Sequence, residues 1–201
     1  MNNSDKIILF GGSFDPPHLG HLLIAQWVAD ALGGVVRFLP AGNPPHKQPL
    51  GSGEHRLEML KLAIAGNQNF LLDDYEYNLH RINYSVETLQ RYQEDFSVSR
   101  DNLFFVLGSD SLRNLNTWRN PQGIASLATL VAFAREAVDW KELLTPLGQL
   151  KAKVVICDAP IIGISSTLIR NRVKRGLSVR YLVSPGVEEY IAKKNLYQEG
   201  I

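Results

Sequence analysis

The chain has 201 residues, of which 45% are hydrophobic and 20% are charged, as in an ordinary globular protein with a sizeable core. Its 21 Lys and Arg residues nearly balance its 20 Asp and Glu residues, and the formal charge of +1 argues against a dedicated nucleic-acid binder. A single cysteine, Cys157, excludes an intramolecular disulfide and fits a reducing compartment. The sequence shows neither a secretory signal nor an apolar run of the roughly 18 residues that a membrane helix needs, so we expect a cytoplasmic protein.

Short apolar runs rich in β-branched and aromatic residues alternate with segments of helical periodicity along most of the chain. The runs predict strands at Ile7–Phe10, Val35–Leu39, Phe70–Leu72, Leu103–Leu107, Thr129–Phe133 and Val154–Cys157. The periodic segments predict helices at His21–Leu32, Glu54–Ala65, Val86–Gln93 and near Ser109. Because continuously apolar strands alternate with helices, we expect an α/β fold: a doubly wound, Rossmann-like parallel sheet. Within it, Cys157, Trp27 and Trp140 are expected to be buried core residues.

After Ile164 the pattern contains helices alone. One is expected to begin at Ser166, with Gly176 after its end, and another at Ser184-Pro185, where serine caps the helix and proline takes its first position. We therefore predict one domain over residues 1–201, in which residues 164–201 form a small C-terminal helical part.

The most informative motif, GGSFDPPHLGH at residues 11–21, lies between the first strand and the first helix. Glycines allow close backbone approach to a ligand, and a helix N-terminus attracts anions. The candidate phosphate-binding residues here are Gly11, Gly12, Ser13, Phe14, His18 and His21. The motif is neither a P-loop nor the dinucleotide fingerprint, since the Gly-Lys-Ser/Thr of the former and the Gly-x-Gly-x-x-Gly of the latter are both lacking.

Three further segments supply candidate ligand-binding residues. The helix start at Ser165, Ser166 and Thr167, followed by Arg170, is a second phosphate grip. The proline-stiffened segment that contains His46 and Lys47 follows the second strand, and we expect the region 41–53 to close over substrate. After the fourth strand, Gly108 precedes Asp110, whose carboxylate suits ribose hydroxyls, and Trp118 offers an exposed aromatic face for stacking.

These motifs resemble those of the nucleotidyltransferases with a histidine-x-glycine-histidine signature and, across nearly the whole chain, the bacterial nicotinate-nucleotide adenylyltransferases. The resemblance implies transfer of AMP from ATP to nicotinate mononucleotide, giving deamido-NAD and pyrophosphate on the route to NAD. It implies His18, His21 and Arg170 as catalytic residues, Mg²⁺ bound with ATP and no dedicated metal site. It also implies a nicotinate-nucleotide site formed by Tyr84, Ser85, Thr117, Trp118 and Arg119. No nucleic-acid or membrane partner is expected, and the oligomeric state is left open, a homo-oligomer included.

The sequence departs from the family pattern in three places. Arg135-Glu136-Ala137 replaces arginine-proline-glycine, which leaves the role of Arg135 open; the run Asp73–Tyr77 replaces an arginine-glutamate pair; and Ser85 replaces threonine. The alternatives are a pantetheine-phosphate adenylyltransferase or cytidylyltransferase, a non-catalytic nucleotide-binding regulator, and a fragment of a class I aminoacyl-tRNA synthetase. The pantetheine-phosphate adenylyltransferases and cytidylyltransferases have no evident use for the proline-proline-histidine-lysine segment or for Trp118. The presence of both histidines and Arg170 argues against a non-catalytic regulator, and this chain lacks the lysine-methionine-serine-lysine-serine loop of the synthetases.

Overall fold

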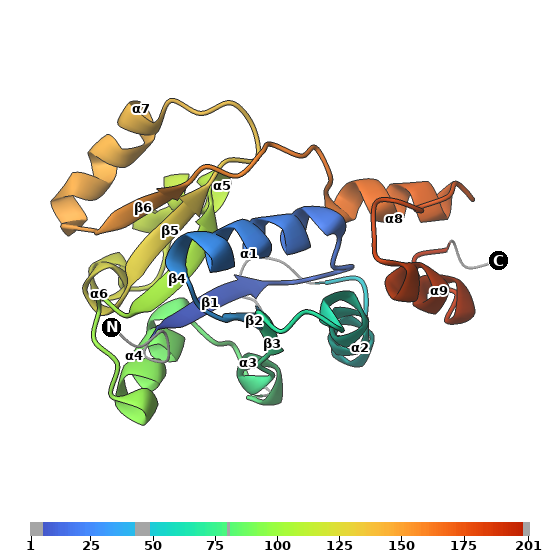
Figure 1. Cartoon of the computed structure of the whole chain (residues 1–201), viewed down its shortest axis with the longest axis horizontal. Coiled ribbons are helices and arrows are strands. Elements are labelled where there is room, and N and C mark those ends of the chain that lie inside the picture. Colours follow the sequence, from blue (N-terminus) through green and yellow to red (C-terminus); the bar gives the residue numbers. More distant parts are fainter. Residues whose placement is uncertain (1–5, 43–48, 80, 199–201) are drawn as a thin grey trace.

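A computed structural model of the chain describes residues 6–42, 49–79 and 81–198. Its centre is a six-stranded parallel sheet with the strand order β3-β2-β1-β4-β5-β6, shown in Figure 1. The strands are β1 (Ile7–Gly12), β2 (Val36–Pro40), β3 (Phe70–Leu72), β4 (Leu103–Gly108), β5 (Thr129–Phe133) and β6 (Val154–Cys157). The predicted parallel sheet is therefore confirmed, and each strand lies within two residues of its predicted bounds.

Helices cover both faces of this sheet. They are α1 (Leu19–Leu32), α2 (Gly53–Ile64), α3 (Tyr75–Asn78), α4 (Ser85–Phe96), α5 (Ser109–Arg113), α6 (Pro121–Leu127), α7 (Trp140–Leu144), α8 (Ser166–Lys174) and α9 (Pro185–Lys193), with 3₁₀ turns η2 (Leu115–Thr117) and η3 (Thr145–Leu150). The sequence did not predict α3, α6 or α7. The starts of two of them carried recognisable signals, because Asn120 caps α6 ahead of Pro121 and Asp139 caps α7.

The alternation of side chains along β1 divides the core into two clusters. Ile8 and Phe10 face one side, where they join buried residues of α1, α2, α8 and α9. Ile7 and Leu9 face the other side and join residues of α4, α6 and α7. Burying both faces explains why the strands read as continuous apolar runs, and it gives the sheet the two helical layers of a doubly wound fold.

Three expectations about individual side chains can be compared directly with the structure. Cys157 is buried at the end of β6, as expected. Trp27 was expected in the core, but 42% of it is exposed, because it lies on the outer face of α1 while Ile24 and Val28 face the sheet. Trp140 is half-buried and packs at the margin of the second cluster.

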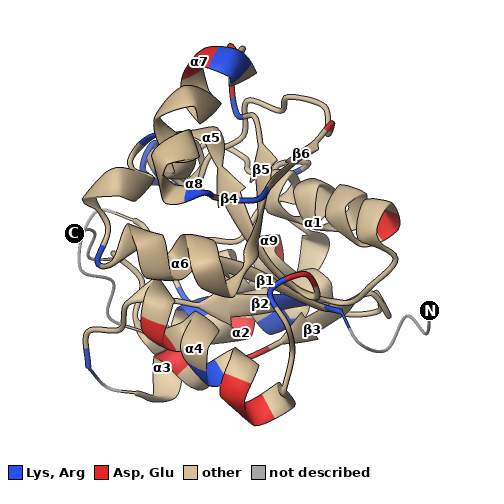
Figure 2. Ribbon diagram, turned by 90° about the vertical axis from the view of Figure 1, so that its left-hand side faces the viewer, with Lys and Arg blue, Asp and Glu red and all other residues tan. Residues whose placement is uncertain are grey.

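The C-terminal helices α8 and α9 lie at one end of the molecule, next to the start of α1 (Figure 1). Their buried residues Ile169, Val187 and Ile191 belong to the same cluster as α1 and α2. In the side view of Figure 2, basic and acidic segments are interspersed, and α4 carries several acidic residues. Among the described residues, no helix is both long enough and apolar enough to cross a membrane.

Candidate active site

The sheet reverses its strand order beside β1, which pairs with β2 on one side and with β4 on the other. Ligands of doubly wound folds bind at this position, beyond the carboxyl ends of the strands. Two cavities open there, the larger of about 520 Å³ and the smaller of about 310 Å³. They share a wall made of Phe10, Gly11, Gly12, Ser13, Ser111 and Arg135. The two cavities are therefore neighbours at the end of the first strand.

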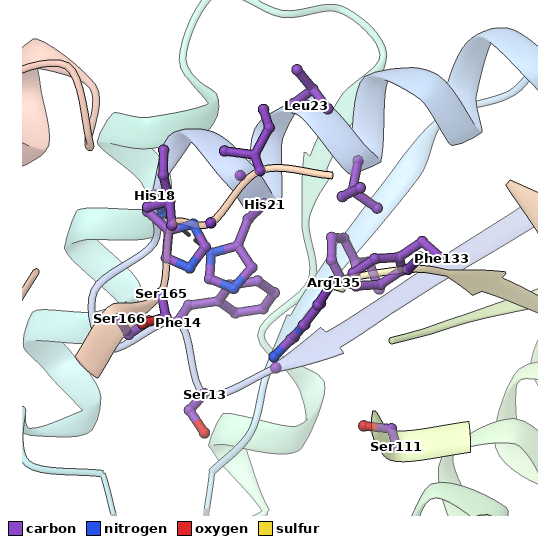
Figure 3. A pocket seen from close by; sticks show the side chains of 18 of the residues that line it. Ser13, Phe14, His18, His21, Leu23, Ser111, Phe133, Arg135, Ser165 and Ser166 are labelled. Atoms are coloured by element: carbon purple, nitrogen blue, oxygen red, sulfur yellow. Dashed lines mark hydrogen bonds between the residues drawn. The ribbon is translucent and has the colours of Figure 1, made fainter. Parts of the chain in front are cut away.

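The larger cavity contains the two histidines of the GGSFDPPHLGH motif, side by side in Figure 3. His18 occupies the N-cap of α1, and its ring stacks on that of His21, with ring centres 3.6 Å apart. The backbone N–H of His18 donates to His21 Nδ1 at 3.2 Å. Since His21 Nδ1 accepts this bond, the ring carries its proton on Nε2 when it is neutral.

Both imidazoles are held in the neutral form. Burial, with a smaller contribution from the Arg135 guanidinium, lowers the pKa of His18 from 6.5 to about 3. Burial also lowers the pKa of His21 well below 6.5, helped by His18 and Arg135. Among the described residues, the buried Nδ1 atom of His18 has no hydrogen-bond partner. The pair can thus offer N–H donors to an anion without adding positive charge.

Phe14 shapes the floor of this cavity. Its side chain is buried and its φ of 48° lies in the left-handed region, which a non-glycine residue adopts at a cost of about 1 kcal/mol or more. The conformation places the Phe14 ring edge-on to His21, with ring centres 5.0 Å apart. Next to Phe14 in Figure 3, Ser165 caps α8 by accepting from the N–H of Leu168, and Ser166 and Thr167 also line the cavity. A helix start and two neutral histidines therefore face one polar space.

Most predicted phosphate-binding residues line this larger cavity: Gly11, Gly12, Ser13, Phe14, His18, His21, Ser165, Ser166 and Thr167. Arg170 and Asp110 do not line either cavity. The Arg170 guanidinium donates to the Asp15 carbonyl at 2.7 Å, and Asp110 forms an ion pair with Arg135 at 3.5 Å. His46 and Lys47 lie outside the described residues. Arg135, whose role the sequence left open, lines both cavities.

The smaller cavity contains most of the predicted pyridine-binding residues, namely Tyr84, Ser85, Trp118 and Arg119. Gly108, which was predicted to bind ATP, also lines this cavity and not the larger one. Trp118 is half-buried, more than expected, because its ring packs against Phe105. The guanidinium of Arg119 stacks over the Tyr84 ring at 4.4 Å. Thr117 does not line the cavity, and its hydroxyl donates to the Asn114 carbonyl.

Sequence reasoning missed Glu76 and Asn83, which also line the smaller cavity. The Thr88 hydroxyl donates to Glu76 Oε1 at 2.7 Å and accepts from Asn83 Nδ2 at 2.6 Å. Burial raises the pKa of Glu76, although its hydrogen bonds counteract the shift. Glu76 lies on the four-residue helix α3, within the run Asp73–Tyr77 that departs from the family pattern, and nothing in that run marks this carboxylate as the buried one. Across the described parts of the chain, no three His, Cys, Asp or Glu side chains form a group that could hold a metal ion.

Comparisons with known proteins agree with this geometry. The model of the cytidylyltransferase-like family matches residues 9–172. A protein of Thermus thermophilus named as a probable nicotinate-nucleotide adenylyltransferase is 42% identical over 194 residues, which cover 96% of this chain and 100% of that protein. A protein of the same name from Caldicellulosiruptor saccharolyticus is 38% identical, with coverage of 96% and 100%. The nicotinic acid mononucleotide adenylyltransferase of Plasmodium falciparum, solved with NaAD, has a similar fold, with a TM-score of 0.81, 20% identity and coverage of 96% and 97%.

Proposed function

The chain belongs to the cytidylyltransferase-like family and, within it, to the nicotinate-nucleotide adenylyltransferases, and from this premise we propose how its two cavities transfer AMP from ATP to nicotinate mononucleotide. The products are nicotinate adenine dinucleotide (deamido-NAD) and pyrophosphate, and the reaction is a step of NAD biosynthesis.

The observation that carries the proposal is the wall that the two cavities share. We assign ATP to the larger cavity, which contains the histidine pair, and the mononucleotide to the smaller one, which contains Trp118. With this assignment the α-phosphate of ATP and the 5′-phosphate of the mononucleotide meet at Gly11–Ser13, where backbone can approach both closely. The wall therefore supplies the proximity that a reaction between two phosphates requires.

The reaction is an in-line attack of the 5′-phosphate oxygen on the α-phosphorus of ATP, with pyrophosphate as the leaving group. The attacking phosphate is ionised at neutral pH, so the enzyme needs neither a protein nucleophile nor a strong base. His18 and His21 donate N–H bonds to the phosphate oxygens on which charge develops, and Arg135 adds positive charge from the shared wall. Arg170, which lines neither cavity and bonds the Asp15 carbonyl and Thr167, stays assigned with Lys47 to the leaving group as a prediction. His46 is assigned to ATP. Mg²⁺ enters as part of the substrate, bound to ATP oxygens.

Recognition of the pyridine ring takes place in the smaller cavity. Trp118 stacks on the ring, and backbone N–H groups at the start of α4, near Tyr84 and Ser85, bind its carboxylate. N–H groups around Thr117 and Arg119 approach it from the other side. A carboxylate gains more from these donors than an amide does, which favours the acid over the amide. Asp110, which lines neither cavity and pairs with Arg135, stays assigned to the ribose of ATP as a prediction.

The proposal extends to the cellular location, partners and oligomeric state of the enzyme. Its single thiol fits the reducing cytoplasm, where ATP is abundant. No nucleic acid enters the reaction. A homo-oligomer stays a prediction, which size-exclusion chromatography with light scattering tests.

Pyrophosphate release from ATP and Mg²⁺ tests the function, with nicotinate and nicotinamide mononucleotides compared side by side. We expect rapid release with the acid and at least tenfold slower release with the amide. Release with phosphopantetheine or glycerol phosphate, and with neither mononucleotide, would assign the chain to another branch of the family. Absence of release with every acceptor would identify a non-catalytic binder.

A further inference from the structure

Asp15 lies within the GGSFDPPHLGH motif but does not line either cavity, and only 3% of it is exposed. Its carboxylate accepts three hydrogen bonds from distant parts of the chain. The N–H of Leu50 donates to Oδ2 at 2.8 Å, and the N–H of Gly51 donates to Oδ1 at 3.1 Å. The hydroxyl of Tyr197, close to the end of the described chain, donates to Oδ1 at 2.6 Å. This buried carboxylate has no role in the reaction as proposed.

The backbone around Asp15 is held just as closely, and mostly by the C-terminal helical part. Three bonds join the two regions: Arg170 to the Asp15 carbonyl at 2.7 Å, Ser166 Oγ to the Pro16 carbonyl at 2.8 Å, and the Leu19 N–H to the Leu182 carbonyl at 2.9 Å. From the other side, the buried guanidinium of Arg56 donates to the Ser13 carbonyl at 2.9 Å. The segment from Ser13 to Leu19 is therefore fixed at both ends and in the middle.

We propose that Asp15 and Tyr197 are positioning residues for the reaction: their hydrogen bond ties the C-terminal helical part to the segment that carries His18 and leads into the first turn of α1, where His21 lies, and so sets the positions of both imidazoles. This inference rests on the proposed function, because it assigns the pair to the reacting phosphates. Neither residue touches substrate, and both act through the backbone between Ser13 and Leu19.

The conformation of this segment needs such support. Phe14, next to Asp15, holds a left-handed backbone conformation that is unfavourable for its side chain, and its ring contacts His21. A segment in that state persists only where its neighbours hold it. His18 also has little freedom, because it is stacked on His21 and buried. A small shift of the segment therefore moves both imidazoles together.

The packing around the carboxylate is tight on the side of Gly51. A Cβ atom added to Gly51 would lie 2.6 Å from Asp15 Oδ1 and 3.2 Å from the Tyr197 hydroxyl. Arg56 provides the neighbouring positive charge that a buried carboxylate requires. Asp15, Tyr197, Gly51 and Arg56 thus form one closed cluster behind the larger cavity.

Two tyrosines of the C-terminal helical part provide a matched pair of variants. Tyr197→Phe removes the hydroxyl bonded to Asp15, whereas Tyr190→Phe removes one bonded to His55 on α2 at 3.0 Å, outside both cavities. We expect Tyr197→Phe to lower kcat about tenfold, because a small displacement of the histidine donors weakens their bonds to the transition state. Its KM for the mononucleotide should change less than about twofold, because Tyr84, Ser85 and Trp118, which are proposed to bind the pyridine ring, lie on other parts of the chain. Tyr190→Phe should leave both constants within about twofold of the wild type.

Gly51→Ala approaches the same carboxylate from the opposite side and should lower kcat at least as much as Tyr197→Phe. NMR spectra of the imidazole carbons supply a readout that does not depend on the acceptor: the His18 and His21 signals should move in Tyr197→Phe and stay in place in Tyr190→Phe. Equal kinetics and unmoved imidazole signals in Tyr197→Phe would overturn the positioning role. If the wild type released no pyrophosphate, the proposed function would fail, while the NMR comparison would still decide whether Tyr197 positions the histidine pair.

Discussion

The two cavities differ in the parts of the chain that line them and in the role proposed for each. The larger one takes most of its polar lining from two short, nearly continuous segments, at Gly11–His21 and at Ser165–Thr167. The smaller one collects Glu76, Tyr84, Phe105 and Trp118 from four separate parts of the chain, and the last three of these supply aromatic rings to its lining. We infer that the first is built to stabilise charge that develops during the reaction, and the second to hold a flat ring still.

Burial acts on titratable groups in both cavities, but in opposite directions. In the larger cavity it lowers the histidine pKa values and so removes positive charge, whereas in the smaller one it raises the pKa of Glu76. Each shift favours the neutral form. The shared Arg135 is then the cation that both cavities have in common, and catalysis depends on donors and dipoles as much as on charge.

The largest expected effect concerns the larger cavity. His18→Ala should lower kcat by about a hundredfold or more, because it removes a donor aimed at charge that forms in the transition state. The KM for the mononucleotide should change little, since His18 does not line the smaller cavity. His55→Ala is a suitable control, because that histidine lies on α2 and bonds Tyr190. Unchanged turnover in His18→Ala would refute the assignment of this cavity to phosphate chemistry.

The second prediction concerns pH and the same histidine. With a pKa of about 3 in the folded chain and 6.5 when unperturbed, His18 is protonated first in the unfolded state. Stability is therefore retained above about pH 6.5 and lost as the pH falls toward 3. Between pH 7 and pH 5 the free energy of unfolding of the wild type should fall by about 2 kcal/mol more than that of His18→Asn. Denaturant titrations at the two pH values measure this difference, and parallel curves would show that His18 takes up a proton normally in the folded protein.

The third prediction reverses the kinetic pattern of the first. Trp118→Ala should raise the KM for nicotinate mononucleotide about tenfold, as expected for loss of one stacking face, and change kcat much less. The KM for ATP should stay within about twofold. Trp27→Ala, on the exposed face of α1, is the matched control. A lower kcat with an unchanged mononucleotide KM would refute the assignment of mononucleotide binding to the smaller cavity.

The smallest effect is expected at Arg119, whose guanidinium stacks on Tyr84 and is exposed. Arg119→Gln should weaken the preference for the acid over the amide about threefold, because an exposed cation contributes well under 2 kcal/mol. Ratios of kcat/KM for the two mononucleotides measure the preference. Arg113→Gln, which removes a cation paired with Glu136, should leave the ratio unchanged. An unchanged ratio in Arg119→Gln as well would leave the backbone donors as the whole source of selectivity.

The contrast between the cavities also explains which parts of the fold and of the site could be predicted from the sequence. Continuous apolar strands and the glycine-histidine motif are local patterns, so the sheet and the histidine pair were predicted from them. Glu76 and Arg135 were not, because their place in a cavity depends on how distant elements pack. The short helices α6 and α7 were missed although Asn120 and Asp139 mark their starts, since too few apolar residues follow to set a helical period. The bonds of Arg170 to Asp15 and Thr167 lay beyond any sequence pattern.

The hydrogen bond between Tyr197 and Asp15 joins residues 182 positions apart, so it can form only after nearly the whole chain has been synthesised. A ribosome that adds roughly 5 to 20 residues per second makes Tyr197 roughly 10 to 40 seconds after Asp15. By then β1 through β6 have been made and can pair, since every strand of the sheet ends by Cys157. The nascent chain should therefore acquire its sheet first and its competence to react last.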